Sequence, residues 1–238
     1  MTSLAPQPRA TPGGKAPPGA PRAVIVGNGP SVDEMGPAFW RRVDADPDIL
    51  LVGTNRALCL RATRNVRWDA LLIRDAYRDL WLDVTWGARY HDQLWKPHPA
   101  WKVGPAAERV THCDEFLRFD GPWRYNLEVD ANGEAVVMAN PSVVLMAANW
   151  AWLHGARELL LVGVDYRGGY ARMLPPFDRA DIGAAGQYDG PVPGRVARRF
   201  LHARQAVRAA GGTMLNLSPR SRLACVARRQ WRKVFSRQ

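Results

Sequence analysis

A short glycine-rich stretch near the start of the chain contains residue types that can hold phosphate groups. Gly27, Asn28, Gly29, Pro30 and Ser31 follow one another directly after a short apolar run. Two glycines permit a tight turn and close approach of the backbone to a ligand, and the exposed N–H groups at a helix start bind anions. The stretch therefore predicts a nucleotide-binding turn. The alternative is an ordinary turn between a strand and a helix.

The same stretch differs from two common phosphate-binding motifs. The third glycine of G-x-G-x-x-G would fall at position 32, which is Val32, and no Lys-Ser or Lys-Thr pair follows as a Walker A loop requires. These differences argue against a simple NAD enzyme and against a P-loop NTPase.

Polar residues also follow two later apolar runs. Asn55 comes after the run 49–53, and Arg74 and Asp75 come after the run 70–73. Asn55 either bonds a ribose or base edge or stabilises a turn, while Asp75 either meets a substrate hydroxyl or pairs with Arg74. We predict nucleotide contact for Asn55 and substrate contact for Arg74 and Asp75.

A helix start in the second half of the chain provides further polar groups. Asn140 can cap this helix and Pro141 can occupy its first position. Asn140 and Ser142 are predicted to contact the nucleotide, and capping is compatible with that role.

The clearest predicted strand of the sequence, 157–163, is followed by residues capable of acid chemistry. These are Asp165, Tyr166 and Tyr170. A carboxylate and two phenols beside a phosphate site can orient a substrate or protonate a leaving group, so all three are predicted to be catalytic. The alternative for each is a structural role.

The sequence does not predict a metal site. Asp44, Asp46 and Asp48 resemble the Asp-x-Asp signature of many nucleotide-sugar enzymes, but they precede the second run and would lie at the opposite edge of a sheet. The five histidines form no H-x-x-x-H pattern, and the three cysteines are far apart.

The pattern of apolar runs predicts an α/β fold with a doubly wound, mainly parallel, Rossmann-like sheet. Predicted strands lie at 23–26, 49–53, 70–73, 157–163 and 213–217, and predicted helices at 32–43, 141–154, 195–210 and 221–235. A tryptophan-rich stretch, about 78–133, is predicted to be an irregular insertion over the sheet edge.

Three regions follow from this division. Residues 1–22 are rich in Pro and Gly and are predicted to be a disordered tail, and 23–218 form the nucleotide-binding transferase domain. Residues 219–238 are predicted to form a basic amphipathic helix that rests on the anionic inner face of a membrane. The alternative is that its apolar stripe packs on the sheet.

The formal charge of +11 over 238 residues favours polyanionic partners, which include nucleic acid, anionic membrane and phosphorylated small molecules. The first residues contain no apolar core of a signal peptide, and no segment approaches about 20 apolar residues. These features predict a cytoplasmic protein.

Several of these motifs together resemble a superfamily of Rossmann-like transferases. The resemblance rests on the stretches Val24 to Ser31, Gly53 to Asn55, Asn140 to Ser142, Leu160 to Asp165 and Leu215 to Ser218. The superfamily includes bacterial sialyltransferases that make lipooligosaccharide and the family similar to 6-hydroxymethylpterin pyrophosphokinase. The resemblance covers Ala23 to about Val226, except the tryptophan-rich insertion.

In the sialyltransferases, these motifs hold a cytidine nucleotide sugar. The resemblance transfers that role to Asn28, Gly29, Ser31 and Asn55, and it gives Ser142 a place near the later helix start. That family also uses two tyrosines after its Gly-x-Asp strand, which Tyr166 and Tyr170 match loosely in spacing. It uses a histidine before the next helix as well, whereas 190–193 contain none.

The resemblance implies a nucleotide-dependent, sialyltransferase-like transferase in cell-surface glycan assembly, with a nucleotide sugar and a lipid-linked acceptor as partners and no separate cofactor. One alternative is pyrophosphokinase-like chemistry with ATP and magnesium held by Asp75 and Asp165. The other alternative is an inactive module that binds nucleotide or nucleic acid.

Overall fold

The computed structural model describes residues 20–74, 84–105, 112–119, 122–126, 135–138, 142–178 and 191–236. The predictions for residues 1–19, Asp75, Asn140 and Pro141 concern residues outside these ranges.

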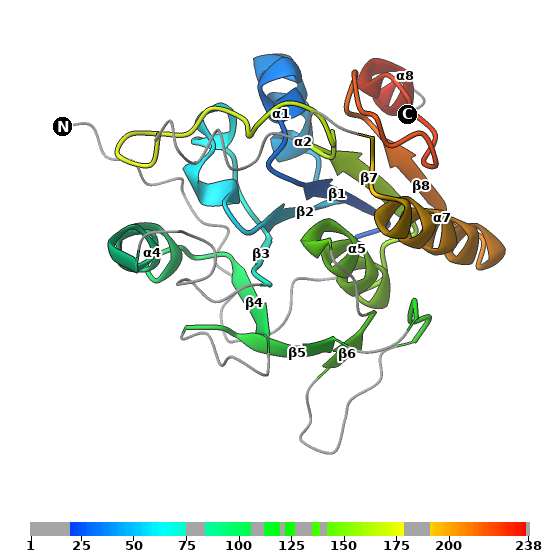
Figure 1. The fold of residues 1–238 in the computed structure, drawn as a ribbon, viewed down its shortest axis with the longest axis horizontal. Helices are drawn as coiled ribbons and strands as arrows, with labels where there is room; N and C mark the ends of the chain where they lie inside the picture. The colour runs from blue at the N-terminus through cyan, green and yellow to red at the C-terminus, as the bar shows by residue number, and fades with distance from the viewer. Residues whose placement is uncertain are drawn as a thin grey trace.

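One parallel sheet of eight strands forms the centre of the described fold, in the order β6-β5-β4-β3-β2-β1-β7-β8 (Figure 1). Every strand pair is parallel. The strands are β1 (Arg22–Val26), β2 (Ile49–Thr54), β3 (Ala70–Leu72), β4 (Trp101–Pro105), β5 (Glu115–Phe119), β6 (Ala135–Val137), β7 (Glu158–Val162) and β8 (Thr213–Asn216). The predicted fold class and all five predicted strands are confirmed.

The central strands are apolar on both faces because helices cover both. In β1, Val24 and Val26 belong to one buried cluster while Ala23 and Ile25 belong to the other. Helices α2 (Gly36–Ala45) and α8 (Trp231–Phe235) pack in the first cluster, and α5 (Val143–Leu153) and α7 (Gly194–Ala209) pack in the second. This two-layer covering is the doubly wound arrangement.

The helix predicted at 32–43 is divided in two. A short α1 (Ser31–Glu34) is followed by α2, whose first residue, Gly36, has a φ of +73°. This left-handed conformation suits glycine and interrupts the helix. The predictions for α5 and α7 are close to the observed bounds, and Gly155, with φ of +101°, follows α5 as expected.

The tryptophan-rich stretch is not merely an insertion over the sheet edge. It contains α4 (Val84–Tyr90), the π-helical turn η3 (His91–Trp95) and two sheet strands, β4 and β5; β6 follows it. The prediction missed these strands because Lys102, Gly104 and Pro105 interrupt any apolar run in β4, and Glu115 and Arg118 do so in β5.

Glu115 of β5 links this added part of the sheet to α5. Its Oε2 accepts hydrogen bonds from the indole nitrogens of Trp101 at 3.2 Å and Trp150 at 2.9 Å. His154 Nε2 lies 3.7 Å from the same oxygen. Burial raises the pKa of Glu115, but His154 and the two indoles lower it more, so that the pKa lies below its ordinary value.

The C-terminal segment does not form the helix predicted at 221–235. Among the described residues of this segment, which end at position 236, the only helix is α8, which begins at Trp231. Before it, the chain runs beside β8, where Asn216 N donates to Ala227 O at 2.9 Å and Arg229 N donates to Asn216 O at 3.1 Å. Leu223, Val226, Val234 and Phe235 are buried in the two clusters. The apolar stripe therefore packs on the domain, as the alternative stated, and is not available to a membrane.

Within the described ranges, no helix has both the length and the apolar character needed to cross a membrane.

Candidate functional site

A pocket of about 220 Å³ lies at the carboxyl ends of the central strands. The strand order reverses between β1 and β7, because the chain proceeds outward from β1 to β6 on one side and continues from β7 to β8 on the other. Ligands of open α/β sheets bind at this position, where successive connections diverge. Eight predicted site residues line the pocket: Gly27, Asn28, Gly29, Asn55, Ser142, Asp165, Tyr166 and Tyr170.

The N–H groups of both glycines in the turn are hydrogen-bonded within the protein. Gly27 N donates to Val162 O at 2.7 Å, and Gly29 N donates to Gly163 O at 2.9 Å. The turn therefore binds the end of β7. At the helix start, Ser31 N donates to Asp165 Oδ2, Val32 N to Gly29 O and Asp33 N to Pro30 O, so these N–H groups, which were expected to be free for a phosphate, are hydrogen-bonded within the protein.

Asp165 occupies the place where a phosphate was expected. Its Oδ2 accepts a hydrogen bond from Ser31 N at 2.9 Å, and the side chain of Ser31 accepts one from Gly163 N at 3.2 Å. Asp165 is 2% exposed and Ser31 is fully buried. Asp165 and Ser31 thus join the first helix start to the end of β7, and their contacts are structural.

Close packing of this turn explains its second glycine. A Cβ at Gly29 would clash with Asp165 Oδ2 and would lie 2.8 Å from Gly163 O. Gly29 is required because Asp165 approaches it, so a valine at this position would disrupt the turn itself rather than fill a phosphate site. Burial raises the pKa of Asp165, and the backbone hydrogen bond from Ser31 opposes that rise.

Asn28 is the residue of the turn best placed to meet a ligand. Its Nδ2 donates to Thr54 O at 3.2 Å, which fixes the amide at the end of β2. Its Oδ1 has no hydrogen-bond partner among the described residues and is buried at the pocket. A buried acceptor without a partner is uncommon and points to a missing donor.

Asn55 has a structural role that supports the same pocket. It adopts φ of +46°, which asparagine tolerates, and its Oδ1 accepts from Arg74 N at 3.2 Å. Its carbonyl accepts from Tyr90 OH at 2.6 Å. The turn-stabilising alternative holds for Asn55. Arg74 does not line the pocket, although its backbone N–H is held by Asn55, which does.

Two tyrosines and a serine form the remaining wall. Tyr166 OH lies 3.5 Å from Ser142 Oγ, so the loop after β7 meets the start of α5. The ring of Tyr170 lies 4.5 Å from the guanidinium carbon of Arg56, a cation–π distance. The two tyrosines and the serine therefore form one side of the pocket, and Arg56 lies against Tyr170 outside the lining. Pro30, the remaining predicted residue, stands at the start of α1 outside its lining.

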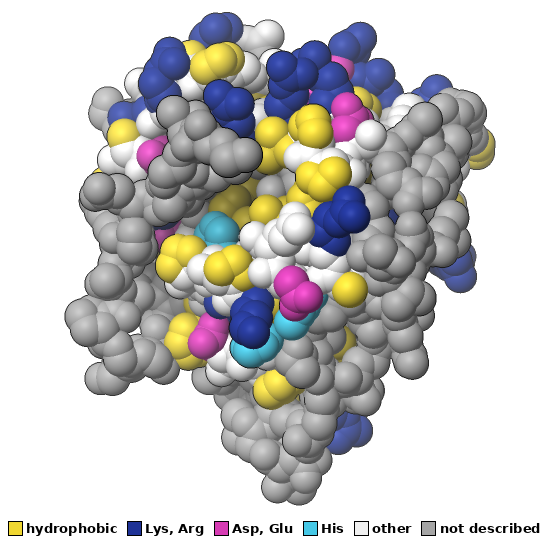
Figure 2. Space-filling view, turned by 90° about the vertical axis from the view of Figure 1, so that its left-hand side faces the viewer, with side chains coloured by type: hydrophobic (Ala, Val, Ile, Leu, Met, Phe, Trp, Pro, Cys, Tyr) yellow, Lys and Arg dark blue, Asp and Glu magenta, His cyan; other side chains and the backbone are white. Residues whose placement is uncertain are grey.

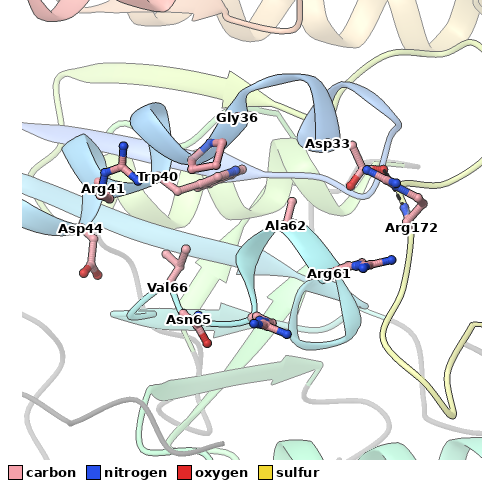
Figure 3. A pocket seen from close by; sticks show the side chains of 12 residues that line it. Asp33, Gly36, Trp40, Arg41, Asp44, Arg61, Ala62, Asn65, Val66 and Arg172 are labelled. Carbon is pink, nitrogen blue, oxygen red and sulfur yellow. Dashed lines mark hydrogen bonds and ion pairs between the residues drawn. The ribbon is translucent and has the colours of Figure 1, made fainter.

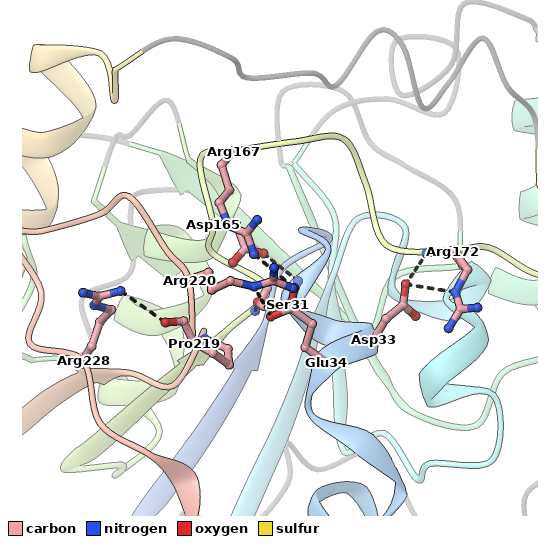
Figure 4. A network of polar contacts seen from close by, with 10 residues as sticks. Ser31, Asp33, Glu34, Asp165, Arg167, Arg172, Pro219, Arg220 and Arg228 are labelled. Carbon is pink, nitrogen blue, oxygen red and sulfur yellow. Dashed lines mark hydrogen bonds and ion pairs between the residues drawn. The ribbon is translucent and has the colours of Figure 1, made fainter.

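Sequence reasoning missed an arginine pair that shares one carboxylate beside the turn (Figure 4). Arg167 lines the pocket and its Nη2 donates to Glu34 Oε1 at 3.0 Å. Arg220 also contacts Glu34 and donates from Nε to Oε2 at 3.2 Å. A basic residue two positions after Asp165 was the available signal, but its acidic partner lies on α1, far away in the sequence.

The Leu215 to Ser218 motif positions the loop after β7. Asn216 Oδ1 accepts from Ser218 N at 3.0 Å and its Nδ2 donates to Ser221 Oγ at 3.0 Å. Ser221 Oγ donates to Val164 O at 2.6 Å, while Ser218 Oγ accepts from Val164 N at 3.1 Å. Both backbone groups before Asp165 are therefore fixed by this buried network.

The described residues contain no group of three or more His, Cys, Asp and Glu side chains that could hold a metal ion.

The described fold is similar to that of solved glycosyltransferases. MAf glycosyltransferase from Magnetospirillum magneticum AMB-1 superposes with a TM-score of 0.54 at 17% identity. The match covers 91% of this chain and 34% of that one, so this chain spans about a third of its length.

Two structures from Campylobacter jejuni show weaker likeness. The monofunctional α-2,3-sialyltransferase Cst-I has a TM-score of 0.48 at 11% identity, over 87% of this chain and 79% of its own. The sialyltransferase CstII, in complex with the substrate analogue CMP-3FNeuAc, has a TM-score of 0.46 at 10% identity, over 87% of this chain and 84% of its own.

At these identities the likeness concerns the fold. None of the three is a pyrophosphokinase, so they do not support the second family that the sequence resembles. No protein-family model and no curated protein sequence matches the chain.

Proposed function

We propose that this protein is a nucleotide-dependent, glycosyltransferase-like transferase that uses a cytidine nucleotide sugar as donor in cell-surface glycan assembly. The observation that carries the proposal is the pocket between the ends of β1 and β7, because it gathers Asn28, Gly29, Asn55 and Ser142, four of the five residues that the sequence resemblance assigns to a nucleotide. The fold shared with a known glycosyltransferase supports this proposal.

Asn28 would recognise a donor group of the nucleotide. Its unpartnered Oδ1 requires an N–H or O–H, and the exocyclic amine of cytosine and the ribose hydroxyls supply such donors. The volume of about 220 Å³ lies below the range of about 300–1,000 Å³ typical of ligand pockets. The pocket would therefore enclose part of the nucleotide and leave the sugar outside.

The phenols of Tyr166 and Tyr170 would act on the phosphate. Both residues line the pocket, and Tyr166 is held beside Ser142. As the bond between the sugar and the phosphate breaks, negative charge grows on the phosphate oxygens that leave with CMP. Phenol O–H groups directed at these oxygens would stabilise that charge.

The position of Asp165 disfavours the pyrophosphokinase alternative. That chemistry would use Asp165 and Asp75 to hold magnesium, yet one oxygen of Asp165 is bonded to Ser31 N and the side chain is 2% exposed.

A thermal-shift panel tests the proposal with CMP, CDP, UDP and ATP, each with and without magnesium. Binding to the folded state raises the melting temperature, so CMP and CDP should stabilise the protein without magnesium and more than UDP does. Stabilisation by ATP only with magnesium would contradict the proposal in favour of the kinase. No response to any nucleotide would leave the inactive, nucleic-acid-binding alternative.

Two variants connect the response to this pocket. Asn28→Ala and Tyr170→Phe should each weaken CMP binding by about tenfold, the effect of one lost charge-assisted or buried hydrogen bond. Tyr125→Phe is the matched control, because Tyr125 is 50% exposed and lies outside the pocket lining. Equal CMP affinity in all three variants would place the nucleotide elsewhere.

A further inference from the structure

A second and larger pocket, of about 490 Å³, lies between α2 and the turn η2 (Arg61–Thr63) with the residues after it. In Figure 3, Trp40 and Asp44 face it from α2, and Ala62, Asn65 and Val66 face it from the opposite side. It shares no lining residue with the nucleotide pocket. Its ligand would therefore bind independently of the nucleotide.

Four arginines line this second pocket: Arg41, Arg61, Arg64 and Arg172. Two of them are brought together by the backbone, because Arg61 N donates to Arg172 O at 2.8 Å beside the bridge between Leu60 and Met173. Like charges held at one end of a pocket repel one another unless an anion lies between them.

The carboxylates of the pocket are already engaged. Asp33 accepts hydrogen bonds from Arg172 N at 2.9 Å and Arg172 Nε at 3.4 Å, and Asp44 accepts from Arg67 N at 3.0 Å. Within the described ranges, the guanidinium groups of Arg41, Arg61 and Arg64 have no acidic partner. The pocket therefore has an excess of positive charge. Figure 2 shows that Arg and Lys side chains gather along the upper part of this side of the molecule.

Trp40 adds an apolar wall and an unused donor. It is 4% exposed, and its indole nitrogen has no hydrogen-bond partner in the described part of the chain. The indole N–H group of a buried tryptophan usually donates a hydrogen bond. The unpartnered N–H group of Trp40 therefore points to an acceptor supplied from outside the protein. Together with Pro37, Ala62 and Val66, the indole gives the pocket a flat apolar side.

We infer that this pocket is a second ligand site, and that it binds a sugar bearing a phosphate or a carboxylate. The arginines would hold the anionic group by charge-assisted hydrogen bonds, and Pro37 and Ala62 on the apolar side of the pocket would contact the sugar ring. The inference does not depend on the proposed transferase activity.

Isothermal titration calorimetry at low salt tests this site with glucose 1-phosphate, glucuronic acid, inorganic phosphate and glucose. Wild-type protein should bind glucose 1-phosphate or glucuronic acid at millimolar or lower concentration, and more tightly than inorganic phosphate or glucose. Saturating CMP should leave this affinity unchanged. Which of the two acids binds tighter identifies the anionic group. Absence of binding by both acids, or equal affinity for inorganic phosphate, would overturn the inference of a sugar site.

Matched arginine variants locate the binding. The double variant Arg61→Gln/Arg64→Gln should raise the Kd by at least about tenfold, because each lost charge-assisted hydrogen bond has an effect of that order. The control Arg195→Gln/Arg199→Gln removes the same charge from exposed positions of α7 and should change the Kd less than about twofold. Equal weakening by both pairs would show a mere net-charge effect and overturn the site.

Trp40→Phe keeps a ring in the wall and removes the N–H group. This variant should raise the Kd for the anionic sugar by about threefold to tenfold. Its binding of CMP should be the same as that of wild type. An unchanged Kd in a folded Trp40→Phe variant would contradict the role given to the indole.

Discussion

At the scale of single residues, the side chains around the glycine turn divide into those that build it and those that face the pocket. Asp165 and Ser31 bind each other across the ends of β1 and β7, and both are buried. Asn28 and Tyr170 line the pocket, and so does Asp165, whose Oδ1 has no hydrogen-bond partner among the described residues. The motifs singled out in the sequence thus contain residues that hold the turn together as well as residues that line the pocket.

A substitution of Asp165 should lower the stability of the fold. Asp165 is 2% exposed and accepts the Ser31 N–H. Asp165→Ala should lower the free energy of unfolding by about 1 to 3 kcal/mol, since it leaves a buried N–H unpaired. Asp165→Asn keeps an acceptor and should lose less. Urea unfolding at pH 7 measures both, and an Ala variant as stable as wild type would contradict this role.

The pH dependence of the Asn variant gives a second test of the same residue. Because the folded-state pKa of Asp165 is raised, its contribution to stability is fully present below its unfolded pKa of about 3.9 and is lost as pH rises through the folded pKa. The stability of Asp165→Asn relative to wild type should therefore increase from about pH 4 upward. A decrease over that range would show that the carboxylate is stabilised by its surroundings.

At this scale, the sequence predicted which residues lie around one pocket. It did not predict which of their polar atoms lack a hydrogen-bond partner within the protein. Eight of the proposed site residues line one pocket because parallel strands end at the same edge. Hydrogen bonds such as that from Gly29 N to Gly163 O depend on a partner more than a hundred positions away, and no local pattern records them.

At the scale of elements, β5 and α5 are connected by a carboxylate that sequence reasoning did not single out. Glu115 accepts from two buried or partly buried indoles, Trp101 and Trp150. Its side chain is 17% exposed. Trp101 of the supposed insertion thus bonds within the sheet layer, to the same carboxylate as Trp150 of α5.

Removal of this carboxylate should loosen the added strands. Glu115→Leu leaves both indole N–H groups unpaired and should lower the free energy of unfolding by about 2 to 4 kcal/mol, whereas Glu115→Gln keeps an acceptor and should lose about half as much. Since the folded pKa of Glu115 is lowered, the advantage of wild type over Glu115→Gln is present above about pH 4.3 and is lost as pH falls through the folded pKa. Urea unfolding between pH 3 and pH 7 checks both statements, and a Leu variant with wild-type stability would refute them.

The apolar strands could be predicted because β1, β2 and β7 are buried on both faces and consist of continuous apolar runs. The strands β4 and β5 could not, since charged residues, glycine and proline interrupt them and only their neighbours in the sheet fix their conformation. The prediction of a helix at 221–235 was wrong for a related reason. Pairing with β8 overrides the helical periodicity at Ala227 to Arg229.

At the scale of the whole molecule, the C-terminal segment completes both layers of the domain. Leu223 and Val226 pack with α5 and α7, while Val234 and Phe235 pack with α2. The positive charges of this segment remain at the surface, as at Arg229 and Lys233.

Loss of residues 221–238 should unfold the domain. The four buried apolar side chains contribute about 1.5 to 3 kcal/mol each, which together approaches the whole stability of an ordinary domain. Arg229→Gln/Lys233→Gln removes exposed charge alone and should melt at the wild-type temperature. Circular dichroism melting compares the two, and a truncated protein with an unchanged melting transition would contradict the packing.

The central claim is that a cytidine nucleotide binds between the ends of β1 and β7, and chemical-shift mapping of backbone amides during a CMP titration tests it most directly. The account predicts that the largest shifts fall on Asn28, Gly29, Val143 and the Gly168 to Tyr170 loop, all of which line that pocket. The amides of the second pocket, including Arg64 and Asn65, should not move. Shifts concentrated away from the β1 and β7 ends, or no shifts at millimolar CMP, would contradict it.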